Sequence, residues 1–156
     1  MNDQASPIRI LVVDDHPVVR AGVETLVTGQ ADMTIVAQAT NGREAIQQFR
    51  SRHPDVTLMD IQMPEMNGLD ALIAIRNESP EARIIMLTTY AGDAQVLRAI
   101  KAGAQGYLLK RALHRELLET IRRVHSGKKA LSAEVSYEVA EHATDDALLR
   151  KFGSCT

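Results

Sequence analysis

Four short apolar runs, each ending in polar residues, constrain the fold of this chain more than any other feature of its sequence. The runs Ile10–Val13, Val56–Met59, Ile84–Leu87 and Gly106–Leu109 lead into Asp14 and Asp15, Asp60, Thr88, and Lys110 respectively. Short runs rich in β-branched residues, separated by stretches with helical periodicity, are typical of parallel strands in an α/β sheet. We therefore expect an α/β fold in which polar residues collect where the strands end.

The segments between these runs carry helix signals, and the clearest is the last. Leu113, Leu117, Ile121 and Val124 recur at helical spacing, and Gly127 follows as a stop signal. Five strand–helix pairs joined by short connections predict a doubly wound, five-stranded parallel sheet with helices on both faces. The predicted strands are Ile8–Val13, Met33–Ala39, Val56–Met59, Arg83–Leu87 and Gly106–Leu109. The predicted helices start at Pro17, after the Asn41–Glu44 capping pair, at Asn67–Gly68, near Asp93 and at Leu113.

Composition limits the function classes without choosing among them. The chain has 156 residues and a net charge of -2, which suits one soluble domain and gives no footprint for nucleic acid or an anionic membrane. The basic cluster at residues 122–129 is interpreted as a solvated helix end. Residues 1–7 lack the apolar core of a signal peptide, and no apolar run is long enough to span a bilayer. With Cys155 as the only cysteine, we expect a cytoplasmic protein.

The polar residues at the strand ends predict one acidic pocket. Ligands of open α/β sheets bind beyond the carboxyl ends of the strands, so Asp14, Asp15 and Asp60 should lie together there. Grouped carboxylates repel one another unless a cation joins them, and Mg²⁺ prefers such oxygen ligands. A zinc site is not predicted, because no Cys/His cluster has ligand spacing.

A carboxylate in such a pocket can also act as a nucleophile on phosphorus and form an aspartyl-phosphate. Phosphoryl transfer requires mainly positioning and charge neutralisation. A metal ion, the ammonium group of Lys110 and the hydroxyl group of Thr88 would each stabilise one oxygen of the transferring group.

Taken together, these motifs resemble the receiver domain of response regulators. The resemblance covers residues 8–127 and rests on separated motifs that occur in the right order. They are Asp14–Asp15, Asp60 with Met63–Pro64 and Gly68, Thr88–Thr89, and Gly106–Lys110. It implies a flavodoxin-like fold with strand order 2-1-3-4-5.

The resemblance also implies a role for each pocket residue. Asp60 would be the phosphoacceptor, with Lys110 pairing with the phosphoryl group. Mg²⁺ would be ligated by Asp15, Asp60 and the backbone carbonyl of Gln62, with Asp14 acting through water. Thr88 would be the switch hydroxyl, and Tyr107 the aromatic side chain that changes rotamer. The donor would be a sensor histidine kinase, and the domain would catalyse only its own phosphorylation and slow dephosphorylation.

Finer features resemble the NarL/FixJ subfamily of transcriptional regulators. These are Asp15–Pro17, Leu87–Tyr90 and Gly106–Lys110, and Ala130–Val135 is similar to that subfamily's linker helix. Phosphorylation would then control dimerisation, and DNA binding would need a helix-turn-helix domain that does not follow in this chain. We expect residues 128–156 to hold the linker helix and a tail that is foreign to the domain or disordered.

One position departs from the broad family pattern, and two other classes remain open. Arg111 stands where many receivers have proline after the lysine, so a cis Lys110–Arg111 bond is not expected. A haloacid-dehalogenase-type phosphatase also uses an aspartyl-phosphate, but its two carboxylates lie in an Asp-x-Asp motif on the first strand. A phosphorylation-independent interaction module is the second alternative. None of the five scattered histidines is assigned a catalytic role, and Gln62 and Tyr90 are candidates for tuning phosphoryl lifetime.

Overall fold

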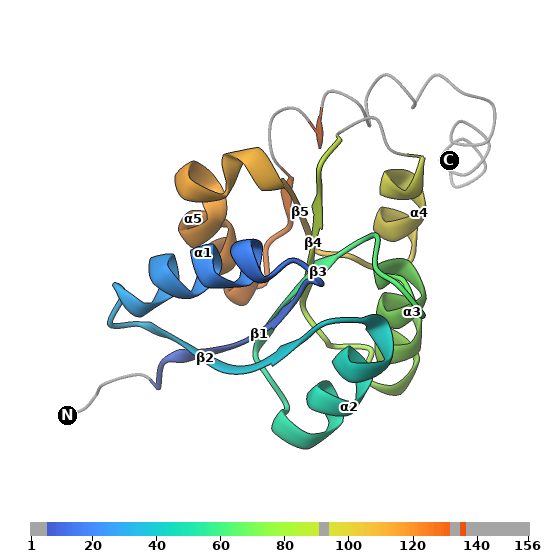
Figure 1. Cartoon of the computed structure of the whole chain (residues 1–156), viewed down its shortest axis with the longest axis horizontal. Coiled ribbons are helices and arrows are strands. Elements are labelled where there is room, and N and C mark those ends of the chain that lie inside the picture. Colours follow the sequence, from blue (N-terminus) through green and yellow to red (C-terminus); the bar gives the residue numbers. More distant parts are fainter. Residues whose placement is uncertain (1–5, 91–93, 132–134, 137–156) are drawn as a thin grey trace.

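The computed structural model describes residues 6–90, 94–131 and 135–136 of the chain. These residues form a six-stranded parallel sheet, in the order β2-β1-β3-β4-β5-β6, between two layers of helices (Figure 1). The strands are β1 (Ile8–Val13), β2 (Met33–Ala39), β3 (Val56–Asp60), β4 (Ile84–Thr88), β5 (Gly106–Leu109) and β6 (Ala130–Leu131). The helices are α1 (Pro17–Thr28), α2 (Gly42–Arg52), α3 (Gly68–Glu78), α4 (Gln95–Lys101) and α5 (Leu113–His125), with a 3₁₀ turn at Lys110–Ala112. The predicted doubly wound sheet and its strand order are confirmed.

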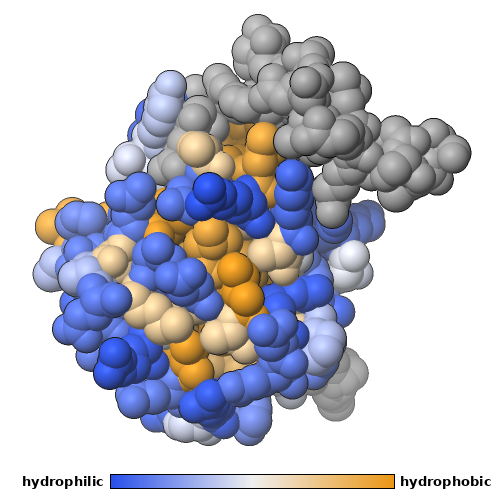
Figure 2. All heavy atoms as spheres, turned by 90° about the vertical axis from the view of Figure 1, so that its right-hand side faces the viewer, coloured by the Kyte–Doolittle hydropathy of each residue, from blue (hydrophilic) through white to orange (hydrophobic). Residues whose placement is uncertain are grey.

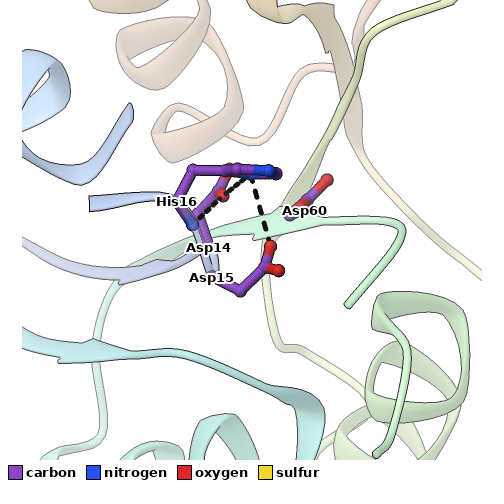
Figure 3. Close-up of side chains that lie close together, drawn as sticks. All are labelled: Asp14, Asp15, His16 and Asp60. Carbon is purple, nitrogen blue, oxygen red and sulfur yellow. Dashed lines mark hydrogen bonds and ion pairs between the residues drawn. The ribbon is translucent and has the colours of Figure 1, made fainter. Parts of the chain in front are cut away.

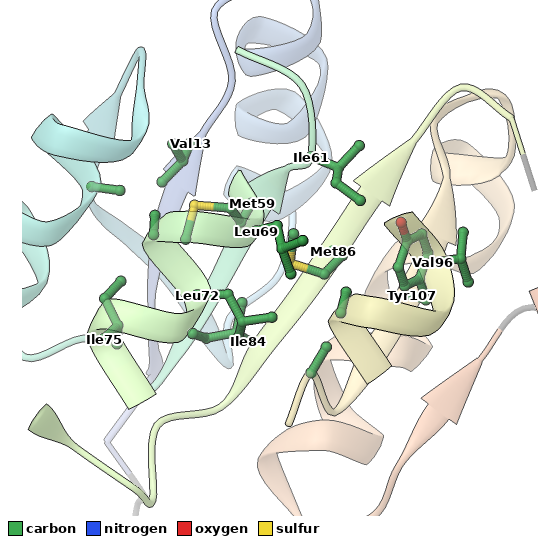
Figure 4. Close-up of a cluster of buried hydrophobic side chains, with 14 of the residues drawn as sticks. Val13, Met59, Ile61, Leu69, Leu72, Ile75, Ile84, Met86, Val96 and Tyr107 are labelled. Carbon is green, nitrogen blue, oxygen red and sulfur yellow. The ribbon is translucent and has the colours of Figure 1, made fainter. Parts of the chain in front are cut away.

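Alternate residues of each strand supply two separate cores. Val13, Met59 and Met86 point to the face covered by α2, α3 and α4 (Figure 4). Ile10 and Leu58 point to the other face, which is covered by α1 and α5. Both faces of the central strands are therefore buried, as is usual for a parallel sheet. On the side that carries α3 and α4, apolar side chains form a band between hydrophilic ones (Figure 2).

The helix ends follow the signals in the sequence. Asn41 caps α2 by accepting a hydrogen bond from the Glu44 backbone N–H at 2.9 Å, and the Glu44 carboxylate accepts one from the Thr40 N–H at 2.8 Å. Asn67 caps α3 in the same way, through the Asp70 N–H. These caps satisfy N–H groups that have no partner within the helix. They fix where each loop at the carboxyl edge of the sheet turns into its helix.

The sixth strand was not predicted. Ala130–Leu131 extends the sheet beside β5, and the Ala130 N–H donates to the Gln105 carbonyl at 2.9 Å. The prediction of a linker helix from Ala130 is therefore wrong for these two residues, because the open edge of β5 pairs with them. Residues 135–136 are helical, and Val135 is completely buried in the core cluster that contains Tyr107. The remainder of the predicted linker helix and the tail lie outside the described residues, as does the predicted helix start at Asp93.

The described part of the chain contains no helix that is both long and apolar enough to cross a membrane. It also contains no cis peptide bond, so the Lys110–Arg111 bond is trans.

Gly68 sets how closely α3 approaches the end of β3. A Cβ atom at this position would lie 2.0 Å from the Asp60 carbonyl oxygen and 2.9 Å from the Asp60 carbonyl carbon. Both atoms are backbone and cannot move aside without moving the strand end. Only glycine therefore allows α3 to start beside Asp60.

We predict that Gly68→Ala destabilises the fold by on the order of 1–3 kcal/mol, because the added methyl group forces α3 away from β3. The matched control is Gly22→Ala in α1, where an added Cβ meets nothing within 4 Å. This control should be more stable than wild type by about 0.5–1 kcal/mol, since alanine is the better helix former. Urea unfolding measures both values, and equal effects at the two glycines would contradict the packing argument.

Candidate functional site

The polar residues that end the strands converge at one edge of the sheet. Asp14 directly follows β1, Asp60 is the last residue of β3, and Thr88 is the last residue of β4. Lys110 directly follows β5. Because these four strands are consecutive neighbours in a parallel sheet, their carboxyl ends lie side by side. The structure thus brings the predicted pocket residues together.

Lys110 is the cation that joins the buried carboxylates. Its Nζ atom lies 2.8 Å from Asp14 Oδ2 and 3.2 Å from Asp60 Oδ2. All three side chains are largely shielded from solvent, with exposed fractions of 11% for Lys110, 0% for Asp14 and 5% for Asp60. The ion pairs therefore link the ends of β1, β3 and β5 in a place where charge–charge interactions are weakly screened.

Burial and neighbouring charges shift the pKa values of Asp60 and Lys110. Burial, followed by the negative charge of Asp14, raises the pKa of Asp60 to about 6, although Lys110 and the Gln62 N–H oppose the rise. Burial lowers the pKa of Lys110, but the hydrogen bond to Asp14 and the charges of Asp60 and Asp14 outweigh it, and the net shift is upward. Near neutral pH, the pocket therefore holds a carboxylate of unusually high basicity beside a firmly protonated amine.

The pocket also contains a set of atoms that fits a metal ion. One ligand atom each from Asp14, Asp15, His16 and Asp60 lies within 4.8 Å of all the others (Figure 3). The buried oxygens Asp14 Oδ2 and Asp60 Oδ2 are contacted by Lys110 Nζ, and the buried oxygen Asp15 Oδ1 is contacted by His16 Nδ1. Clustered oxygen ligands of this kind suit a hard divalent cation.

The acidic group opens onto a cavity of about 450 Å³ between the β1–α1 and β3–α3 loops. Its lining residues are Asp15, Ile61, Gln62, Met63, Pro64, Asn67 and Gln95. The Gln62 N–H approaches Asp60 Oδ1 at 3.4 Å, which places the Gln62 backbone next to the carboxylate. The cavity therefore reaches the acidic group through Asp15, and the backbone on either side of it includes Ile61 and Gln62, which directly follow Asp60.

Thr88 and Tyr107, the two predicted switch residues, are both buried. The Thr88 hydroxyl lies 3.3 Å from both the backbone N–H and the carbonyl of Tyr90. Tyr107 is fully enclosed in the same core cluster as Val96 of α4 (Figure 4). Thr88 is thus tied to the loop that follows β4, and Tyr107 packs under α4.

His16 is the residue of this site that the sequence reasoning missed. Its Nδ1 atom lies 2.9 Å from Asp14 Oδ1 and 3.3 Å from Asp15 Oδ1, on the rim of the acidic group. The signal was its position directly after the Asp14–Asp15 pair. Adjacency alone does not give the direction of the ring.

Comparison with known proteins matches the sequence to one family. The "Response regulator receiver domain" family matches residues 10–122, which is most of the chain. The chain belongs to the response-regulator receiver family. The predicted resemblance is therefore confirmed. The receiver is 39% identical over 126 residues to the nitrate/nitrite response regulator protein NarL of Escherichia coli, covering 81% of this chain and 58% of NarL. It is 34% identical over 129 residues to the response regulator protein VraR of Staphylococcus saprophyticus, covering 83% and 62%.

Solved structures agree with the sequence matches. A LuxR-family two-component response regulator from Aurantimonas superposes with a TM-score of 0.84 at 36% identity, covering 90% of this chain and 100% of the other. The response regulator domain of Thermotoga maritima CheB superposes with a TM-score of 0.72 at 34% identity, covering 77% and 97%. The receiver spans only 58–62% of the length of NarL and VraR. The similarity is therefore to one part of those proteins.

The raised pKa of Asp60 predicts how pH affects stability. From pH 4 to pH 6 the native state holds a proton that the unfolded state, with a pKa near 3.8, has lost, so stability falls as pH rises. The penalty is complete above about pH 6. Asp60→Asn removes it, so in metal-free buffer this variant should match wild type near pH 4. At pH 7 it should be more stable than wild type by on the order of 1–3 kcal/mol.

Urea unfolding across this pH range measures the difference, with Asp70→Asn on the exposed face of α3 as the control carboxylate. A constant difference between wild type and Asp60→Asn from pH 4 to 7 would show that Asp60 titrates normally.

Proposed function

We propose that this receiver takes a phosphoryl group from the phosphohistidine of a sensor kinase onto Asp60, in a Mg²⁺-dependent reaction, and slowly hydrolyses it. The observation that carries the proposal is the position of Asp60. It lies at the centre of the strand edge, with Lys110 Nζ at 3.2 Å, Asp15 in the same ligand group and a cavity beside it. With a pKa of about 6, Asp60 is a carboxylate at neutral pH and a better nucleophile than an ordinary aspartate.

The bonds formed and broken in the transfer involve only Asp60 and the donor, with Mg²⁺ and Lys110 neutralising charge. A carboxylate oxygen of Asp60 bonds to phosphorus as the P–N bond of the phosphohistidine breaks. The electron pair of that bond stays on the imidazole, which takes up a proton. In the slow dephosphorylation, water attacks phosphorus and the P–O bond to Asp60 breaks. The carboxylate and inorganic phosphate are released. Lys110 neutralises charge on the phosphoryl oxygens in both steps.

The residues present fit Mg²⁺, and their contacts separate the direct ligands from the one that acts through water. Asp14 Oδ1 already accepts hydrogen bonds from the backbone and ring of His16, and Asp14 Oδ2 is held by Lys110. We therefore assign direct ligation to Asp15, Asp60 and the Gln62 carbonyl, with Asp14 acting through water. Bound Mg²⁺ would neutralise part of the charge on the transferring group.

The switch is assigned to Thr88 and Tyr107. Within the described part of the chain, the Thr88 hydroxyl makes two long contacts, both 3.3 Å and both to the Tyr90 backbone, which would yield readily if the hydroxyl turned toward a phosphoryl group on Asp60. That movement would carry the loop after β4 and change the packing of α4 over Tyr107. The face formed by α4, β5 and α5 would then differ between the two states.

The proposed output of the signal is supported by the relatives and not by the described residues. NarL and VraR are named as response regulators, and this receiver matches one part of each. We propose that it works in the cytoplasm as the phosphorylated half of a transcription regulator of the NarL/FixJ type. Phosphorylation would promote dimerisation and DNA binding through a separate domain, and no external substrate would be turned over.

Intact mass after incubation with acetyl phosphate tests the proposal. Wild type should gain one phosphoryl group in Mg²⁺ and none in EDTA, Asp60→Asn should gain none, and the control Asp70→Asn should behave as wild type. Lys110→Ala should accept the group far more slowly. No adduct on a folded protein would favour an interaction module, and steady release of phosphate from a phosphate ester would favour a phosphatase.

The same samples test the switch. Phosphorylated wild type should show shifted amide resonances in α4 and β5, whereas phosphorylated Thr88→Ala should not. Thr88→Ser, which keeps the hydroxyl group, should respond as wild type does. Identical shifts in Thr88→Ala would remove Thr88 from the switch.

A further inference from the structure

The residues that follow α5 cover the side of β5 that β4 leaves open. Ala130–Leu131 forms β6 there, with Leu131 in register with Tyr107. Ala130 belongs to the core under α5, Leu131 packs against the core under α4, and Val135 is completely buried in that second core. Ala130, Leu131 and Val135 are called the edge segment below. The edge segment therefore contacts both cores at the open side of β5.

Tyr107 lies between the edge segment and the middle of the sheet. Its register partners are Met86 of β4 on one side and Leu131 of β6 on the other. Tyr107 and Met86 have no exposed surface, and Val96 of α4 belongs to the same cluster (Figure 4). Because protein interiors are packed as densely as organic crystals, the Tyr107 ring can turn only if one of these neighbours moves.

The edge segment is the neighbour that is held by few backbone bonds. β4 pairs with β3 on one side and β5 on the other, whereas β6 is two residues long and, among the described residues, pairs with β5 alone. Its hold on the sheet therefore depends mainly on burying the side chains of Leu131 and Val135. Segments with few backbone bonds open at the lowest free energy, so the edge segment should yield before β4 does.

We propose that the edge segment holds Tyr107 in its buried position, and that phosphorylation of Asp60 releases this segment from β5. The inference rests on the proposed function, because it uses the movement assigned to Thr88 and Tyr107. As the ring turns it displaces Leu131, β6 leaves the edge of β5, and Val135 leaves the core. The signal then passes to the part of the chain that follows α5. Leu131 and Val135 act as positioning residues for the switch.

Release of the edge segment and occupation of the phosphoryl site must then favour each other. If occupation weakens the docking of the segment, thermodynamic linkage requires that weaker docking strengthens occupation by the same factor. Beryllium fluoride binds reversibly to an aspartate in place of a phosphoryl group. Its affinity in the presence of Mg²⁺ therefore measures the linkage at equilibrium.

Hydrogen exchange of the Ala130 amide in the full chain tests the release. This N–H donates to the Gln105 carbonyl, so it should exchange slowly in the free protein. With beryllium fluoride and Mg²⁺ it should exchange at least about tenfold faster, because burial of one valine side chain is worth more than that factor. The Gln105 amide, which donates to the Ile84 carbonyl, should stay slow and show that β5 itself remains paired. Thr88→Ala should bind the probe without speeding exchange at Ala130.

Val135→Ala tests the linkage, with Val27→Ala as the matched control. Both valines are buried, but Val27 lies on α1 in the other core. Val135→Ala should speed exchange at Ala130 in the free protein at least about tenfold, and should bind beryllium fluoride more tightly by up to the same factor. Val27→Ala should change neither quantity. Titration calorimetry gives the affinities, and circular dichroism of each variant checks the fold.

The outcomes separate this inference from the proposed function. If wild type binds beryllium fluoride and the Ala130 amide stays slow, the edge segment is not released, and the receiver function is left intact. Release in Thr88→Ala as in wild type, or equal affinities in Val135→Ala and wild type, also overturns the inference alone. If wild type binds no beryllium fluoride in Mg²⁺, the proposed function is overturned and this inference falls with it.

Discussion

The ion pairs between Lys110 and the buried carboxylates of Asp14 and Asp60 are the interaction on which the functional edge of this molecule depends. They join the ends of three strands at distances of 2.8 and 3.2 Å. Two carboxylates this close would repel each other strongly without the ammonium group between them. Removing Lys110 alone would leave two uncompensated buried charges, which is far costlier than losing a surface ion pair.

Lys110 offsets only part of the cost of burying the Asp60 carboxylate. The remaining cost is what suits the site to its proposed chemistry. The pKa of Asp60 remains raised to about 6 despite Lys110, so its carboxylate is less stable here than in water. A metal ion or a bond to phosphorus would each relieve that strain. A core built only for stability would have placed apolar residues at this edge, as it does along most of β1 and β3, where Arg9 and Thr57 are the other polar residues. The polar residues at this edge lower the stability of the fold locally, and the two apolar cores offset that loss.

Most of the fold could be predicted from the sequence because its signals are local. Strand ends, the caps at Asn41 and Asn67, and the amphipathic period of α5 depend on residues close in the chain. The β6 strand could not be predicted, since two residues carry no period and their pairing depends on the open edge of β5. Bonds such as Arg122 to Asp32, 90 residues apart, follow from the packing and leave no trace in the pattern.

The candidate site, like the fold, could be predicted from the sequence only in part. Which residues meet was predictable, because parallel strands deliver their carboxyl ends to one edge. How they meet was not, because the direction of the His16 ring and the pairing of Lys110 with Asp14 depend on side-chain rotamers. The basicity of Asp60 likewise depends on its burial, which requires the packed structure.

Equilibrium unfolding with and without Mg²⁺ tests the central claim, that this strand edge is a cation-binding site built from buried carboxylates. If Mg²⁺ binds only the native state, stability should rise with its concentration, by about 2.7 kcal/mol at one hundred times the dissociation constant. Asp15→Asn should lose most of that gain. NaCl at matched ionic strength should give little of it. Equal stabilisation by Mg²⁺ and by NaCl would contradict the account, because the carboxylates would then be responding only to charge screening.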